Sequence, residues 1–176
     1  MAETANEART PKKPKRTAKY YAIRFFVRIG VTLAALVIIL TFVAGIYVNH
    51  TNSSYPMIKD GDLCFTYKLG KAEQGDVIAY RSGKGIKFGR VIAFEGDTVD
   101  IKDDYIAVNG YGIFDNTVYA TTAEGSQITY PYTVKKGTVF VLNDFRSDVS
   151  DSRTLGSIPL SDCKGKVVFI MRRRGI

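Results

Sequence analysis

The sequence predicts an all-β domain, built mainly from antiparallel sheets, that follows one N-terminal transmembrane helix. The helix is predicted by a single long apolar stretch, residues 29–48, which contains no charged residue. The β domain is predicted by residues 49–176, where short runs rich in Val, Ile, Tyr and Phe alternate with Gly, Asp and Asn. This part shows no apolar stripe at helical spacing with capping residues. We therefore expect a tail, an anchor and one folded domain.

Residues 1–28 form a basic tail. They hold eight of the 25 Lys and Arg residues, against Glu3 and Glu7, and they contain two prolines and no apolar periodicity before Tyr20. This composition is typical of a disordered segment. The formal net charge of +8 is therefore concentrated at one terminus, and 49–176 is close to balanced with seventeen basic and fifteen acidic residues. A nucleic-acid-binding surface on the folded domain is not expected.

Residues 29–48 are long enough to cross a membrane, since about 1.5 Å per residue gives roughly 30 Å. A cleaved signal peptide is the competing interpretation, but its apolar region would be shorter and would end in small residues. The sequence Ile46-Tyr47-Val48-Asn49-His50 offers no such site, which favours a retained anchor. The basic residues before the stretch place residues 1–28 in the cytoplasm and 49–176 outside it. The predicted location is the cell membrane, with a single pass.

Seven runs in the exported part are predicted strands, with Asp103-Asp104 as a hairpin turn. They are Leu63–Tyr67, Asp76–Tyr80, Gly85–Phe94, Thr98–Ile101, Tyr105–Val108, Thr138–Leu142 and Lys166–Arg172. Residues 111–132 are less regular, and we expect an insertion that shapes a binding surface.

Cys64 and Cys163 are too few for a disulfide scaffold and lack metal-ligand spacing. One disulfide and two buried thiols both remain open. His50 is the only histidine, so no metal site and no cofactor is expected.

Ser53 opens the stretch Ser53-Ser54-Tyr55-Pro56-Met57-Ile58-Lys59-Asp60-Gly61-Asp62, just beyond the apolar run. A serine three residues before a proline, followed by an apolar pair and a Gly-Asp turn, indicates a hydroxyl on a tight bend that leads into a strand. Either a serine peptidase nucleophile or a polar juxtamembrane linker fits this pattern.

Four ordered segments decide between these interpretations. They are Ser53-Ser54-Tyr55-Pro56 with Gly61-Asp62, then Gly75-Asp76-Val77-Ile78-Ala79-Tyr80, then Gly89-Arg90-Val91-Ile92 with Gly96-Asp97, and finally Asn143-Asp144-Phe145-Arg146 with Asp151-Ser152-Arg153. In order and spacing they resemble the boxes of type I signal peptidases, over about residues 45–170. The resemblance implies a signal-peptidase-like fold and cleavage of signal peptides at the outer membrane face by a Ser nucleophile and a Lys general base.

The resemblance assigns the nucleophile position to Ser53, with the adjacent Ser54 leaving the register open by one, and the oxyanion-hole position to Thr51. The base position falls on Gly89, which has no side chain. The hydroxyl that supports the lysine falls on Val149. The catalytic pair therefore lacks its proton acceptor.

Other residues that the resemblance singles out have binding or structural roles. The implied binding groove consists of Tyr55, Pro56, Met57, Lys87 and Phe88. The last box supplies Asp144, Arg146, Asp151, Ser152 and Arg153, which we expect to hold a loop against the sheet.

Two residues offer a substitute base. Lys87 shares a strand face with Gly89, roughly 6.6–7 Å along the chain, although nothing predicts its desolvation. His50 lies three residues before Ser53 and is more typical of a residue at the level of lipid headgroups.

The segments Lys87-Phe88-Gly89-Arg90 and Val141-Leu142-Asn143-Asp144-Phe145-Arg146 resemble more closely the signal-peptidase-like proteins of Gram-positive pilus loci, where glycine replaces the lysine. That resemblance implies a non-proteolytic accessory factor in pilus assembly, with a pilin or another exported precursor, a sortase and membrane lipid as partners. An active signal peptidase with Ser53 and an unconventional base is the alternative. A membrane-tethered binding module unrelated to secretion is a third interpretation.

Overall fold

The computed structural model describes residues 17–102, 104–114 and 117–172. The chain divides after Val37 into an N-terminal unit and a unit formed by residues 38–176. Helix α1 runs from Ala18 to Ile38, so that all but its last residue lies in the first unit. The second unit continues with a short π-helix, Ile39–Val43. Ala18–Val43 is long and apolar enough to cross a membrane. Residues 1–16 of the predicted tail lie outside the described residues.

The helix begins earlier and ends earlier than the predicted span of 29–48. Its last predicted residues, Ala44–Val48, form strand β1 instead, which pairs along its whole length with β2 (Leu63–Tyr67) in antiparallel register. Hydropathy could not separate the two states, because an apolar strand and the end of an apolar helix have the same composition. Gly45 lies against the Tyr47 ring and the Thr66 hydroxyl, where a Cβ would approach within 2.6 Å of Tyr47. The site that follows β1 is thus tied to the sheet directly.

The predicted strands agree with the structure to within two residues at each end, except that the last begins three residues earlier than predicted, and the two-residue strands β7, β8 and β10 were not predicted. The strands after β2 follow in chain order. They are β3 (Val77–Ser82), β4 (Gly85–Phe94), β5 (Thr98–Lys102), β6 (Tyr105–Val108), β7 (Tyr111–Gly112), β8 (Tyr132–Thr133), β9 (Thr138–Leu142), β10 (Ile158–Pro159) and β11 (Cys163–Met171). All their pairings are antiparallel, so the all-β, mainly antiparallel fold class is confirmed.

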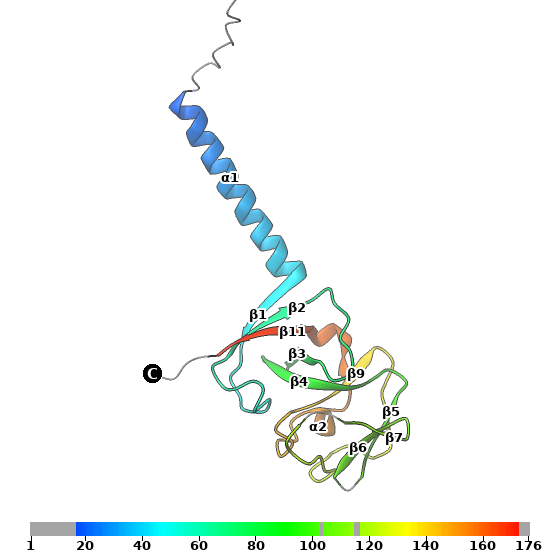
Figure 1. Ribbon diagram of the computed structural model, residues 1–176. Helices are drawn as coiled ribbons and strands as arrows, with labels where there is room; N and C mark the ends of the chain where they lie inside the picture. The colour runs from blue at the N-terminus through cyan, green and yellow to red at the C-terminus, as the bar shows by residue number, and fades with distance from the viewer. Residues whose placement is uncertain (1–16, 103, 115–116, 173–176) are drawn as a thin grey trace, which may run out of the picture. The chain divides into compact units, whose positions relative to one another are not determined.

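The strands form two sheets. The larger has the order β1-β2-β11-β3-β4-β9-β10 and the smaller the order β7-β6-β5-β8. Figure 1 shows β1, β2 and β11 side by side at one end of the domain and β5, β6 and β7 at the other. Three apolar clusters fill the interior: one joins β4 and β9 to the small sheet, and the other two involve strands β3 and β4 and include Tyr80 and Phe88 respectively.

Three Gly-Asp pairs form similar turns. In each, the aspartate carboxylate accepts a hydrogen bond from the backbone N–H three residues earlier: Lys59 N to Asp62, Glu73 N to Asp76, and Phe94 N to Asp97, at 2.9, 2.7 and 2.8 Å. The carboxylate closes a loop that glycine allows to turn. These motifs are therefore structural features of the chain.

Residues 111–132, expected as an irregular insertion, run from β7 to β8, and the described residues between those strands are neither helix nor strand. The segment returns to the core through Ile113, Ile128 and Tyr130, which pack on the cluster beneath the small sheet. Cys64 and Cys163 are both free thiols, which settles the open disulfide question. The single helical turn α2 (Ser152–Leu155) belongs to the last sequence box.

Candidate functional site

Ser53 lies in a loop that backbone and amide groups hold in place. The Asn49 side chain, 1% exposed, donates to the carbonyls of Thr51 and Lys59 at 2.6 and 3.0 Å. The neighbouring Ser54 hydroxyl donates to the Phe88 carbonyl of β4 at 2.9 Å, and Phe145 N donates to the Ser53 carbonyl at 2.9 Å. The loop is thus attached both to β4 and to the last sequence box.

The Ser53 hydroxyl has a carboxylate as its hydrogen-bond partner. Its Oγ donates to Oδ2 of Asp148 at 2.6 Å, across 95 residues of sequence, and the Ser53 side chain is largely buried. Oδ1 of Asp148 accepts a second bond, from Ser150 N at 2.9 Å. Burial alone would raise the pKa of Asp148, but hydrogen bonds from Ser150 and Ser53 and the nearby Lys87 charge lower it below its ordinary value.

Lys87 belongs to the same hydrogen-bond network, which it joins through Ser150. Its Nζ donates to the carbonyl and the hydroxyl of Ser150, at 3.0 and 2.9 Å. The order of contacts is Ser53, Asp148, Ser150, Lys87. In the part of the chain that the structure describes, neither Lys87 nor His50 makes a hydrogen bond to the Ser53 hydroxyl.

Gly89 is buried in β4 against three neighbours. A Cβ at this position would lie 3.2 Å from Cε1 of Tyr80, 3.3 Å from Cβ of Val141 and 3.4 Å from the Leu142 carbonyl oxygen. Tyr80 is fully buried, and burial followed by the charges of Asp151 and Asp148 raises its pKa. Its hydroxyl has no hydrogen-bond partner among the described residues. The position that the resemblance assigns to a base is thus enclosed by side chains.

Val149 and Thr51 hold the two other positions with an expected chemical role. Val149 faces Gly125 of the insertion, since a Cβ on Gly125 would meet its side chain at 3.4 Å, and it brings no hydroxyl to the site. The Thr51 hydroxyl donates to the Asn49 carboxamide oxygen at 3.4 Å.

The residues of the last box make a dense set of ion pairs and hydrogen bonds. Arg90 contacts Asp144 through two bonds of 2.7 Å. Arg153 and Asp151 are fully buried and joined at 3.0 and 2.8 Å, and Arg153 also donates to the carbonyls of Arg146 and Asp148. The Ser152 hydroxyl accepts from Val141 N at 3.0 Å. Because Arg153 holds the backbone of residue 148, this cluster positions the carboxylate that meets Ser53.

The five residues of the expected groove separate in the structure. Pro56 and Met57 line a cavity of about 510 Å³ together with Lys59, Arg90, Thr117, Val118, Asp144 and Arg172. Tyr55 is partly exposed beneath the Lys59 ammonium, which lies 5.4 Å from its ring centre. Phe88 instead points into the core at 1% exposure and offers only its carbonyl, and Lys87 turns to Ser150.

Sequence reasoning did not identify Asp148. It searched for Lys and His as bases and treated the fourth box as structural, so an acid inside that box was not considered as a partner of Ser53. The one available signal was its position five residues before Arg153, in a segment expected to fold back on the sheet.

Comparison with known proteins shows the family of the chain. The family described as "Signal peptidase, peptidase S26" matches residues 22–172. Signal peptidase IB of Staphylococcus aureus is 29% identical over 167 residues, which cover 84% of this chain and 87% of that protein. Signal peptidase I of Bacillus amyloliquefaciens is 28% identical over 154 residues, 80% of each chain. A crystal structure of a signal peptidase I from Enterococcus faecalis V583 aligns with a TM-score of 0.47 and 26% identity, covering 57% of this chain and 99% of that one. Because the family match spans residues 22–172, the chain belongs to the type I signal peptidase family.

Proposed function

We propose that this protein is a membrane-anchored, signal-peptidase-like factor that binds an exported polypeptide without cleaving it and assists the assembly of pilins at the cell surface. The observation that carries the proposal is the environment of Ser53, whose hydroxyl donates to Asp148 rather than to a neutral amine.

Attack by a serine on a peptide carbonyl requires a base that takes the hydroxyl proton. Asp148 accepts the hydrogen bond, but its pKa lies below the ordinary range because Ser150, Ser53 and Lys87 stabilise the carboxylate against the effect of burial. A carboxylate of lowered pKa has little tendency to take a proton from a hydroxyl at neutral pH. Lys87 Nζ is directed at the carbonyl and the hydroxyl of Ser150, and not at the Ser53 hydroxyl. This arrangement favours a hydroxyl that stays protonated.

Binding without cleavage uses the cavity lined by Pro56, Met57 and Arg90. Exposed strand edges and a groove of this kind can take an extended segment through backbone hydrogen bonds. The resemblance to pilus-locus proteins suggests which polypeptide is bound, namely a pilin that is held near a sortase. The basic residues before α1 favour an orientation with the domain on the outer side of the membrane, where such clients would be assembled.

An active peptidase is the second candidate, and the short Ser53–Asp148 contact is the observation in its favour. If Asp148 acted as the base, only its ionised form would work. Cleavage would then be lost as the pH falls through the lowered pKa of Asp148 and would reach a plateau well before neutrality.

The proposal is tested in a strain that carries the gene and its pilus locus. Deletion should abolish pilus polymerisation, and expression of Ser53→Ala should restore it as fully as the parent chain. Failure of Ser53→Ala to restore polymers, while the protein reaches normal levels in the membrane, contradicts a non-proteolytic role. Normal polymerisation in the deletion strain contradicts a role in pilus assembly.

A further inference from the structure

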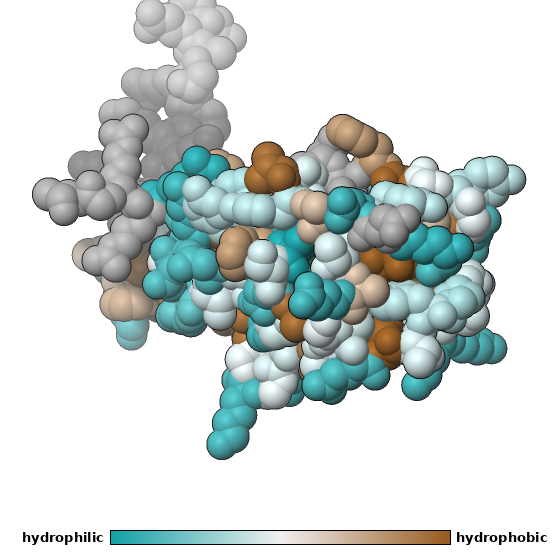
Figure 2. Space-filling view, turned by 90° about the horizontal axis from the view of Figure 1, so that it is seen from below, coloured by the Kyte–Doolittle hydropathy of each residue, from teal (hydrophilic) through white to brown (hydrophobic). Residues whose placement is uncertain are grey.

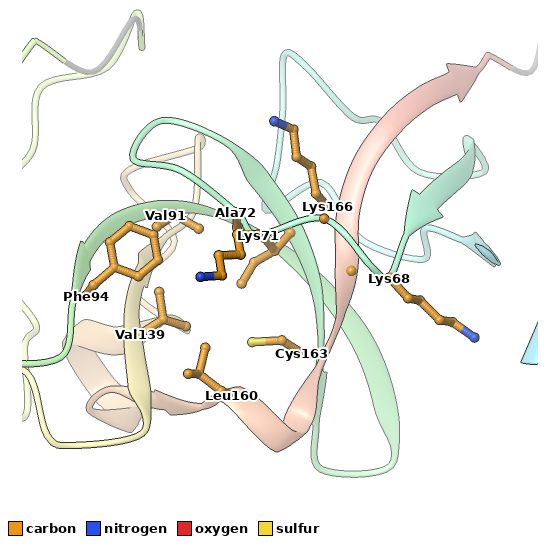
Figure 3. A pocket seen from close by; sticks show the side chains of 12 residues that line it. Lys68, Lys71, Ala72, Val91, Phe94, Val139, Leu160, Cys163 and Lys166 are labelled. Atoms are coloured by element: carbon orange, nitrogen blue, oxygen red, sulfur yellow. The ribbon is translucent and has the colours of Figure 1, made fainter. Parts of the chain in front are cut away.

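A further cavity has none of the residues around Ser53 in its lining. It has a volume of about 540 Å³, within the range of small-molecule sites. Its apolar lining includes Ile78, Val91, Phe94, Val139, Leu160 and Cys163 (Figure 3). It shares no lining residue with the cavity beside Pro56 and Met57. Val91 lines this cavity and the adjacent Arg90 lines the other, as expected for successive residues of a strand, whose side chains point to opposite faces.

The loop that borders this cavity is bonded to the end of the candidate membrane span. Lys68 N donates to the Val43 carbonyl at 2.8 Å, and Lys68 Nζ donates to the carbonyls of Leu40 and Thr41 at 2.8 and 3.0 Å. Val43 is the last residue of the span. The neighbouring Leu69 has 63% of its surface exposed. One lining residue of the cavity, Lys68, is therefore bonded to the last residues of the candidate span.

Three lysines border the cavity, and they differ in their contacts. Lys68 Nζ donates a hydrogen bond to the Leu40 carbonyl of the candidate span, and Lys166 forms an ion pair with Asp76 at 2.8 Å. Lys71 is exposed, and Figure 3 shows its side chain extending over the space between Phe94, Val139 and Cys163, while Lys68 and Lys166 point away. Lys71 has no ion-pair partner among the described residues.

We propose that this cavity binds an anionic phospholipid, with one acyl chain in the apolar space and the phosphate at Lys71. The apolar lining matches a hydrocarbon chain and the cation matches a phosphate. The bond from Lys68 N to the Val43 carbonyl joins the border of the cavity to the end of the candidate span, which is where a bilayer lipid would be at hand. The face of the domain in Figure 2, by contrast, is mainly hydrophilic with separate hydrophobic spots. The lipid would hold the loop of residues 68–72 against the membrane surface, independently of any chemistry at Ser53.

The absence of tryptophan from the chain allows a direct test. The full chain is placed in phosphatidylcholine vesicles that contain a minor share of phosphatidylglycerol brominated on its acyl chain, a quencher of tryptophan fluorescence. Leu160→Trp reports from the cavity. Leu69→Trp, in the same region but outside the cavity lining, reports simple proximity to the membrane. Quenching of Leu160→Trp should be several-fold stronger with brominated phosphatidylglycerol than with an equal share of brominated phosphatidylcholine.

Two variants on the reporter background separate the cavity from the membrane surface. Ala72→Phe fills the cavity and should remove most of the quenching of Leu160→Trp while leaving that of Leu69→Trp unchanged. Lys71→Glu should weaken the phosphatidylglycerol effect on the order of tenfold, because a charge near the surface is reversed. Lys84→Glu makes the same charge change in the distant β3–β4 turn and should have no effect.

Equal quenching by the two brominated lipids would overturn the proposal, as would quenching that Ala72→Phe and Lys71→Glu leave unchanged. A membrane-spanning apolar peptide is added as a final arm. If an equimolar amount of it abolishes the quenching of Leu160→Trp, the occupant is a polypeptide and the lipid assignment is wrong. Lys71→Glu is a surface substitution, so this arm remains informative if Ala72→Phe does not fold.

Discussion

At the scale of single residues, Asp148 determines the state of the Ser53 hydroxyl. It accepts bonds from Ser53 and from Ser150 N, and its pKa is lowered despite partial burial. Asp148 was not recognisable from the sequence, because its partner is 95 residues away and only the folded chain brings the two together. Ser53, Thr51 and Gly89 could be located in advance because they lie within contiguous boxes, although their roles remain predictions.

The first prediction concerns Asp148→Asn. Loss of the charge-assisted bonds should lower the free energy of unfolding by about 1 kcal/mol near neutral pH, a value reduced by the partial exposure of the group. Because the folded-state pKa is lowered, the folded protein binds fewer protons than the unfolded chain, so the stabilisation is present above the unfolded value near 3.9. It is lost as the pH falls through the folded-state value.

Urea unfolding of Asp148→Asn and of the parent chain, near neutral pH and at about pH 3 and below, measures this effect. The difference between the two proteins should shrink in acid. The exposed residue Asp104 provides the control, since Asp104→Asn should behave like the parent throughout. An Asp148→Asn difference that does not change with pH would show that the carboxylate charge contributes nothing.

The second prediction concerns Gly89→Lys, which restores the residue type that the family resemblance expects. The new side chain must displace the buried Tyr80 ring, Val141 and the Leu142 carbonyl, at a cost of about 1–3 kcal/mol. We expect the substitution alone to yield a less stable protein, and no cleavage of a signal peptide, because Ser53 remains bonded to Asp148. Gly85→Lys, in the same strand with no atom within 4 Å of its Cβ, should leave stability within about 0.5 kcal/mol of the parent.

Thermal unfolding compares Gly89→Lys with Gly85→Lys, and a precursor-processing assay follows activity. Equal stability of the two variants would mean that the space beside Gly89 is open. Cleavage by Gly89→Lys would mean that the missing lysine is the sole defect of the site.

At the scale of elements, strand β11 holds the large sheet together. It pairs with β2 through Lys166–Met171 and with β3 through Cys163–Lys166, and its register shifts between Cys163 and Gly165. Gly165 has φ +117, and a Cβ there would lie 2.6 Å from the Tyr67 carbonyl oxygen. The sequence predicted the second half of this strand and missed its start, because the glycine and the flanking lysines give a weak strand pattern.

The third prediction follows from this geometry. Gly165→Ala combines an unfavourable backbone conformation with a backbone clash, so we expect a loss of about 3 kcal/mol or more, or failure to fold. Gly112→Ala, whose Cβ would meet only the Tyr105 ring at 3.8 Å, is the matched control. Circular dichroism during urea unfolding distinguishes them, and a fully stable Gly165→Ala would require a different path for β11.

Strand β1 shows where sequence reasoning at this scale fails. Residues 44–48 are as apolar as a membrane span, and only pairing with β2, a tertiary contact, makes them a strand. The strands β2, β4, β6 and β9 were predictable at both ends because turns with Gly, Asp or Asn bound them.

At the scale of the whole molecule, the chain combines the signal peptidase fold with a serine whose partner is an acid. The fold class and the family were predictable from ordered boxes, since turn residues and Asp–Arg pairs are local or semi-local features. The hydrogen-bond partner of Ser53 could not be predicted from the sequence, because it depends on which side chains the fold brings together.

The fourth prediction concerns the thiols. Burial first, and then the charge of Asp62 or Asp162, raises the pKa of Cys64 and of Cys163 to about 11. Both should therefore be protonated and slow to alkylate near neutral pH, with labelling that accelerates as the pH approaches this value. Mass spectrometry after timed alkylation of the folded, full-length chain measures this directly. Rapid neutral-pH labelling of Cys64, which is fully buried, would contradict the packing around β2.

The central claim is that Ser53 does not act as a nucleophile, and single-turnover processing tests it most directly. The purified full chain, in excess over a pilin or secretory precursor in the same vesicles, is sampled over hours by mass spectrometry, with Staphylococcus aureus signal peptidase IB as the positive control. The account predicts uncut precursor with the parent chain and with Ser53→Ala alike. A cleaved product that the parent forms and Ser53→Ala does not would contradict it.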